Sequence, residues 1–184
     1  IDADIPTTAE ASGDPYNPEV CPSDHHAIFS FPANSWRGPI RVDWYQGTLK
    51  PASPNPAIDI LKIGHGVMFK GTKGALLADF NTRILVPAQD GADMTYYKSP
   101  AKEQIAPPHG SFVGQWINAC KGDLKTSCDF DYAGRMIETL MLGLAAHKAG
   151  KVLTYDPSSG RVTNYSEPNE NLSKQYRKGW VLNG

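Results

Sequence analysis

The strand-like segments of this chain follow one another through short links, with no helix between them. Residues 25–31 and 40–45 alternate apolar and polar side chains, as strands do. Residues 67–70 and 75–80 flank a glycine-bracketed turn at 71–74, which is typical of a hairpin. Strands joined by short links pair antiparallel, so a doubly wound parallel sheet is excluded. The pattern predicts an α+β fold with antiparallel strand pairing, in which strands dominate the first half of the chain and helices the second.

Two segments in the second half of the chain have helical periodicity. Residues 112–121 place apolar side chains three and four positions apart, and residues 131–149 do so over a longer stretch. Asp129 or Asp131 is suited to cap the start of the longer helix, and Gly150 is suited to end it. We expect the longer helix to bury one apolar stripe, formed by Ala133, Met136, Ile137, Leu140, Met141, Leu144 and Ala145.

The remaining segments predict shorter or irregular elements. Residues 1–6 alternate like a strand, whereas residues 7–24 are rich in proline, serine and acidic residues and predict a long loop. Residues 87–108 predict an extended surface loop. A last hairpin is expected within 151–163, followed by a short polar helix at 171–178.

The composition is that of an ordinary globular domain. The chain has 184 residues, of which 40% are hydrophobic and 20% charged. A net charge of −1 gives no electrostatic attraction to nucleic acid or to an anionic membrane, and no apolar run is long enough to span a bilayer. The widely spaced Cys21, Cys120 and Cys128 do not suggest a disulfide framework, so we expect buried free thiols. A bond between Cys120 and Cys128 stays open.

No set of residues with catalytic spacing stands out in the sequence. The Gly-His-Gly run at 64–66 begins like a dinucleotide fingerprint, but Phe69 occupies the third glycine position and a strand follows instead of a helix. His25 and His26 are neighbours on a strand and point to opposite faces, so they are not expected to share a metal ion. We therefore expect no catalytic residue, no cofactor-binding residue and no metal ligand in this chain.

Trp44, Tyr45 and Gln46 end a predicted strand just before a glycine. Aromatic rings stack on polyols, and an amide both donates and accepts hydrogen bonds, so this group fits a carbohydrate. A packed aromatic plug followed by a strand-end turn is the competing interpretation. The basic and aromatic segment 176–180 predicts a docked C-terminal helix instead of a binding surface.

Four stretches between residues 27 and 180 form a recognisable set of motifs. They are VDWYQG at 42–47, GVMFKGTKGALLADF at 66–80, GSFVGQWINACKG at 110–122, and SCDFDYAG at 127–134, which Glu138-Thr139 and Gly150-Lys151 follow. Together with YRKGW at 176–180, this set resembles a bacterial dehydrogenase branch of the glucose–fructose oxidoreductase / inositol dehydrogenase / MocA (Gfo/Idh/MocA) family. Phe112 stands where that branch often has a histidine, so no polar role is expected of it.

The resemblance implies a two-domain NAD(P)-dependent dehydrogenase of a sugar or polyol, with residues 1–184 as its C-terminal substrate and oligomerisation domain. In the family, an N-terminal Rossmann domain binds NAD or NADP. A lysine in an EKP motif and an Asp/His pair, both preceding the region matched here, complete the catalytic set. The chain has no EKP and no Asp-x-x-x-His, and it begins at Ile1 instead of Met. The resemblance therefore implies a truncated piece with a dihydrodipicolinate-reductase-like C-terminal fold, a large, mostly antiparallel open β-sheet with flanking helices. We expect it to have no nicotinamide cofactor and no activity of its own.

The resemblance also implies a substrate side and an assembly surface. In the family, one sheet face helps to close the substrate site and the sheet builds dimers or tetramers. We accordingly expect a homo-oligomer through the sheet face and a sugar-like ligand, in either the cytoplasm or the periplasm. The competing hypothesis is a stand-alone carbohydrate-binding or assembly module, and a hydrolase built from scattered His and Asp has less support. The substrate-side candidates are Trp44, Tyr45, Gln46, Lys62 and His65.

Overall fold

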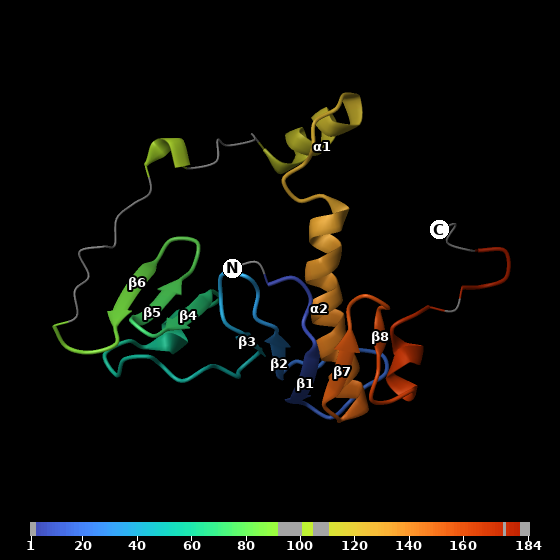
Figure 1. Ribbon diagram of the computed structural model, residues 1–184, viewed down its shortest axis with the longest axis horizontal. Helices are drawn as coiled ribbons and strands as arrows, with labels where there is room; N and C mark the ends of the chain where they lie inside the picture. Colours follow the sequence, from blue (N-terminus) through green and yellow to red (C-terminus); the bar gives the residue numbers. More distant parts are fainter. Residues whose placement is uncertain (1–2, 92–100, 105–110, 175, 181–184) are drawn as a thin grey trace. The chain divides into compact units, whose positions relative to one another are not determined.

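The chain forms two compact units, and each is described here by itself (Figure 1). The computed structural model describes residues 3–91, 101–104, 111–174 and 176–180. The first unit combines Ile1–Leu49 with Gly122–Gly184, and the second is Lys50–Lys121. The predicted α+β class with antiparallel pairing is confirmed. The strands form a five-stranded and a three-stranded sheet, however, where the family resemblance implies one large sheet.

The first unit is built on the five-stranded sheet, whose strand order is β3-β2-β1-β7-β8 and whose neighbours are all antiparallel. Its strands are β1 Thr8–Gly13, β2 His25–Phe31, β3 Ile40–Gln46, β7 Leu153–Asp156 and β8 Arg161–Val162. The predicted strands at 25–31 and 40–45 and the last hairpin are confirmed.

Strand β1 occupies the centre of this sheet, between β2 and β7. The prediction of a loop over 7–24 is therefore wrong for residues 8–13, and the predicted strand at 1–6 does not form over residues 3–6. The apolar residues of β1 are only Ala9, which is fully buried, and Ala11. Because two methyl groups make a weak apolar alternation, the strand leaves little signal in the sequence.

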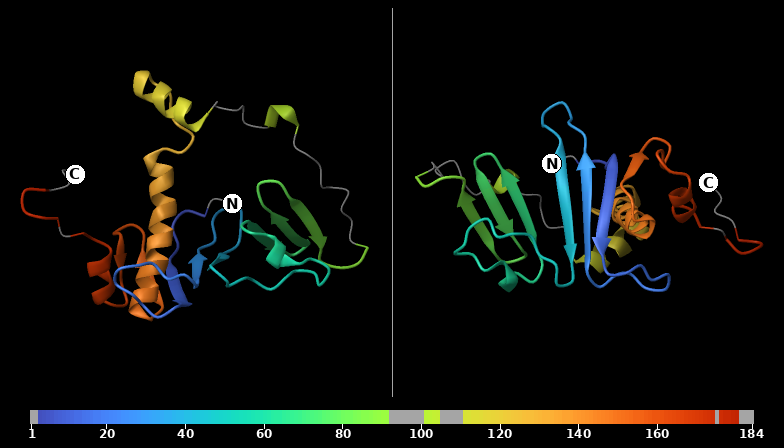
Figure 2. Two further views of the ribbon diagram at one scale, coloured as in Figure 1. Left: turned by 180° about the vertical axis from the view of Figure 1, so that it is seen from behind. Right: turned by 90° about the horizontal axis from the view of Figure 1, so that it is seen from below.

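Helix α2, Phe130–Ala149, crosses one face of this sheet (Figure 2). The Asp129 side chain accepts a hydrogen bond from the Tyr132 N–H at 2.9 Å, and Gly150 ends the helix in the left-handed conformation at φ 59°. Both predicted caps are thus confirmed. The C-terminal half of α2 packs on β1 and β2, whereas its N-terminal half extends beyond the sheet (Figure 1).

The buried stripe of α2 differs from the predicted one. The buried residues of the helix are Leu142, Gly143, Ala145 and Ala146. Only Ala145 belongs to the predicted stripe, and the exposed fractions of Met136, Ile137 and Met141 are 46%, 53% and 47%. The prediction is wrong because α2 has apolar residues on two sides, and helical periodicity alone does not tell which side the sheet covers.

The second unit contains the three-stranded antiparallel sheet, in the order β4-β5-β6. Its elements are η1 Ile60–Lys62, β4 Val67–Gly71, β5 Gly74–Ala78, β6 Arg83–Pro87, η2 Lys102–Gln104 and α1 Phe112–Lys121. The predicted hairpin turning at 71–74 and the predicted helix 112–121 are confirmed. A small core forms around Ala75, Leu77 and Val86. The predicted loop 87–108 lies in part outside the described residues.

The C-terminal segment and the cysteines depart from prediction. A short 3-10 helix, η3 Glu167–Asn171, forms before the predicted helix 171–178, and residues 172–174 and 176–180 are not helical. The Asn169 side chain accepts a hydrogen bond from the Val162 N–H and donates one to the Val162 carbonyl, which ties η3 to β8. All three cysteines are free, but they are exposed instead of buried. Cys21 lies in the loop between β1 and β2, Cys120 on α1, and Cys128 in the segment before α2.

Candidate functional site

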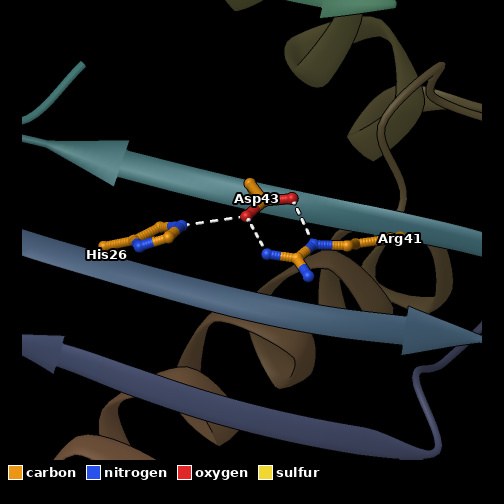
Figure 3. A network of polar contacts seen from close by, with 3 residues as sticks. All are labelled: His26, Arg41 and Asp43. Carbon is orange, nitrogen blue, oxygen red and sulfur yellow. Dashed lines mark hydrogen bonds and ion pairs between the residues drawn. The ribbon is translucent and has the colours of Figure 1, made fainter. Parts of the chain in front are cut away.

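A network of charged side chains lies on the sheet face opposite α2 (Figure 3). His26 Nε2 is 2.9 Å from Asp43 Oδ1, and Arg41 donates two hydrogen bonds of 2.8 Å to the two oxygens of Asp43. The register of β2 and β3 pairs His26 with Tyr45 and Ile28 with Asp43. Because successive residues of a strand alternate between faces, all of these side chains project to the face opposite α2.

The charges in this network stabilise one another. The two hydrogen bonds from Arg41 hold the pKa of Asp43 below its usual value, and His26 adds a smaller contribution. The same contacts raise the pKa of Arg41. The Tyr45 ring stacks on the His26 ring at a centroid distance of 4.2 Å and an interplanar angle of 9°. The result is an ordered polar surface that suits recognition of another polar surface.

A cavity of about 620 Å³ lies in the first unit, between α2 and the segment 16–22. Its size is within the range that small-molecule sites occupy. Ile137, Met141 and Leu144 supply an apolar wall from α2. The polar groups that line it include Tyr16, Glu19, Glu138, Lys148 and Asn171.

The polar groups of the cavity are partly fixed by mutual contacts. The Tyr155 hydroxyl donates to Glu138 Oε1 at 2.6 Å, and burial together with Glu138 raises the pKa of Tyr155, so its hydroxyl stays a donor. The Lys148 ammonium donates to the Asn171 amide oxygen and lies 5.6 Å from the centroid of the Tyr16 ring. The cavity thus offers a carboxylate, an ammonium and an aromatic ring to a small polar ligand.

Two histidines meet in the layer between β2 and α2. The rings of His25 and His147 have a centroid distance of 5.3 Å and an interplanar angle of 87°. His25 is 4% exposed, and the Nε2 atoms of both rings are buried without a hydrogen-bond partner. The Gly143 carbonyl accepts a hydrogen bond from His25, and since Nε2 has no partner, the donor is Nδ1. His25 is therefore the tautomer with a bare lone pair on Nε2.

Stability should decrease as the pH falls through about 6.5, the ordinary pKa of histidine. Burial lowers the pKa of His25 in the folded chain, and the neighbouring His147 and His26 lower it further. The unfolded chain consequently binds more protons than the folded chain below that pH, so acid favours unfolding. Urea denaturation of the wild type and of His25→Gln at pH 7.5 and 5.5 measures the effect. If the free energy of unfolding falls equally in the wild type and in His25→Gln between pH 7.5 and 5.5, His25 is not the group that causes the loss.

The predicted substrate-side residues of β3 do not share a face. Trp44 pairs with Ala27, which α2 covers, so Trp44 lies on the helix side of the sheet, where it is 44% exposed. Tyr45 lies on the opposite face, in the charged network. Gln46 returns to the helix side and donates from Nε2 to the Pro22 carbonyl at 2.8 Å. Strand alternation thus separates Tyr45 from its two neighbours.

The other two candidates, Lys62 and His65, belong to the second unit. Lys62 ends η1, and its ammonium is 3.7 Å from the Asp59 carboxylate. The His65 ring makes an edge contact with Phe80 at a centroid distance of 5.2 Å. Both side chains are exposed, and their place on a substrate surface stays a prediction.

Some residues of the site were not predicted, although the sequence contains a pattern that indicates them. Arg41 and Asp43 are opposite charges two positions apart on a strand, which places them on one face and predicts an ion pair. The inward position of His25, in phase with Ala27 and Phe29, likewise signals a buried histidine. The cavity beside α2 leaves no such local signal, because segments distant in the sequence build it.

Comparison of the chain with models of known protein families gives no match, and comparison with curated proteins gives none either. Within the described part of the chain, no three or more His, Cys, Asp or Glu side chains are grouped to hold a metal ion. No helix among the described residues is long and apolar enough to cross a membrane. A function for this chain therefore rests on its own residues.

Proposed function

We propose that this chain is the C-terminal domain of an NAD(P)-dependent oxidoreductase of the Gfo/Idh/MocA family that acts on a sugar or polyol. The supporting observation is that the four longer motifs of the resemblance each fall on one local element of the structure. The motif at 42–47 covers the end of β3 and its turn, 66–80 the β4–β5 hairpin, 110–122 helix α1, and 127–134 the start of α2. In this proposal, the β-sheet structure with its helices corresponds to the dihydrodipicolinate-reductase-like C-terminal fold.

The exposed N-terminal half of α2 supports a partner domain. Phe130, Met136 and Ile137 expose 94%, 46% and 53% of their surfaces. Clustered exposed apolar side chains mark interfaces. In the proposed enzyme, a Rossmann domain covers this side of α2 and binds NAD or NADP. The described domain then supplies a substrate-side wall and an assembly surface, and hydride transfer belongs to the complete enzyme.

The same proposal makes the charged sheet face a contact between copies of the chain. We expect the protein to self-associate in light scattering. We expect Arg41→Glu to weaken association at least about tenfold, since it reverses a charge on the proposed contact surface and breaks the pair with Asp43. Lys70→Glu, which changes an exposed lysine of the second unit, serves as the control and should associate like the wild type. A wild type that stays monomeric at high concentration would count against the contact.

The cavity beside α2 favours a second candidate, a stand-alone carbohydrate-binding module. Its aromatic ring, carboxylate, amide and ammonium are the groups that recognise a sugar, and its volume admits one. In this case the sugar binds without any nucleotide. Glu138 and Asn171 then provide the contacts that distinguish one sugar from another.

Calorimetry with NADH, NADPH and a panel of sugars tests both candidates on the same protein. The oxidoreductase proposal expects no heat from either nucleotide, because their site lies on the Rossmann domain. Nucleotide binding by this chain would contradict it, since the chain would then have a nucleotide site of its own. Sugar binding that is lost in Glu138→Gln would support the carbohydrate-binding module. If no sugar of the panel gives a heat of binding, the carbohydrate-binding module is rejected.

A further inference from the structure

The pair formed by His25 and His147 has no role in the proposed oxidoreductase. Buried polar atoms in proteins almost always have a hydrogen-bond partner, and an unpartnered one costs about 1–3 kcal/mol. Here two such atoms, the Nε2 atoms of His25 and His147, are buried in the same layer without partners. One of these ring nitrogens lies on β2 and the other on α2. A single ligand that accepts an electron pair from each of them would give both a partner.

We propose that His25 and His147 bind one divalent transition-metal ion of the zinc type, which ties strand β2 to helix α2. Imidazole nitrogen is a preferred ligand of this ion class. With Zn–N bonds of about 2.0 Å and a tetrahedral angle, two imidazoles on one ion have ring centroids roughly 5 Å apart. The observed centroid distance of 5.3 Å matches that spacing.

The hydrogen bond from His25 to Gly143 orients the His25 ring for metal binding. The Nδ1–H group donates to the Gly143 carbonyl, which fixes the ring orientation and leaves Nε2 free to coordinate. Metal-binding histidines characteristically make such a bond through their second nitrogen.

The protein supplies two ligands, and water completes the coordination. His147 lines the cavity beside α2, which gives an ion at this pair a path to solvent. Among the described residues no third His, Cys, Asp or Glu joins the pair, so the remaining ligands of the proposed ion are water molecules. This inference is independent of the oxidoreductase proposal, because it concerns only the contact between β2 and α2.

The test uses Zn²⁺ alone on the full chain in which the three exposed thiols are replaced, as Cys21→Ser, Cys120→Ser and Cys128→Ser, since thiols also bind zinc. A ligand that binds only the folded state raises the melting temperature, and we expect a rise of at least about 2 °C with excess Zn²⁺ at pH 7.5. The rise should vanish in His25→Gln and in His147→Gln. It should persist in His26→Gln and His65→Gln, which remove histidines outside the pair.

Co²⁺ provides a readout that does not depend on the variants. With the thiols replaced, bound Co²⁺ should show a visible ligand-field band of tetrahedral type that one equivalent of Zn²⁺ removes. No band and no thermal shift in the thiol-free protein overturn the proposal, even where His25→Gln fails to fold. An equal shift in His147→Gln also overturns it, because the ion then binds elsewhere.

Discussion

Replacing Leu142 by alanine is expected to lower the free energy of unfolding by about 2–5 kcal/mol. Leu142 is 1% exposed and packs from α2 into the core that contains Phe29 and Leu153. Truncation removes apolar contacts and leaves a cavity, which a sheet held by its own hydrogen bonds cannot fill by collapsing. Urea denaturation followed by circular dichroism measures the change.

Met141→Ala is the matched control for Leu142→Ala. The two residues are neighbours on the same helix, but Met141 is 47% exposed. Its truncation should cost less than about 1 kcal/mol. A larger loss at Met141 than at Leu142 would mean that α2 is rotated so that the stripe predicted from the sequence faces the core.

Gly143→Ala is expected to lower the free energy of unfolding by up to about 2 kcal/mol, although alanine is the better helix former. A Cβ at this position would lie 2.8 Å from Phe29 Cζ and 3.1 Å from Ala27 Cβ. Phe29 is 1% exposed and has no space to move into, so the helix and the sheet must separate. Overpacking of this kind costs about 1–3 kcal/mol and exceeds the gain in helix propensity of about 1 kcal/mol.

Gly134→Ala, on the same helix, should have the opposite sign. A Cβ at Gly134 meets nothing within 4 Å, so only the gain in helix propensity remains. We expect stabilisation of about 0.5–1 kcal/mol in the same urea experiment. If both substitutions stabilise the chain, α2 does not approach β2 as closely as the structure places it.

The fold was predictable where local patterns are strong. Residues 25–31 alternate clearly, glycines bracket the turn at 71–74, and Asp129 and Gly150 mark the ends of α2. Strand β1 could not be predicted, because Ala9 owes its burial to the helix above it and not to its own hydrophobicity. The division into two sheets also depends on long-range pairing, such as that of β1 with β7, which no local pattern encodes.

The candidate site was less predictable than the fold. The adjacent polar and aromatic residues Trp44, Tyr45 and Gln46 were predicted to lie together on the substrate side. Because side chains alternate along a strand, Tyr45 lies on the face opposite the other two. The His25–His147 pair joins residues more than a hundred positions apart, so only the packing of α2 on β2 brings them together. The candidate sites of this chain therefore depend on tertiary packing more than on local motifs.

The most direct test of the oxidoreductase proposal is the intact mass of the protein made from its native gene. The 184 residues here have a mass of 20.0 kDa. The proposal expects a product larger by at least a Rossmann domain, which adds on the order of 100–150 residues, and NAD(H) or NADP(H) binding by that product. A native product of about 20 kDa that binds no nicotinamide nucleotide would contradict the proposal.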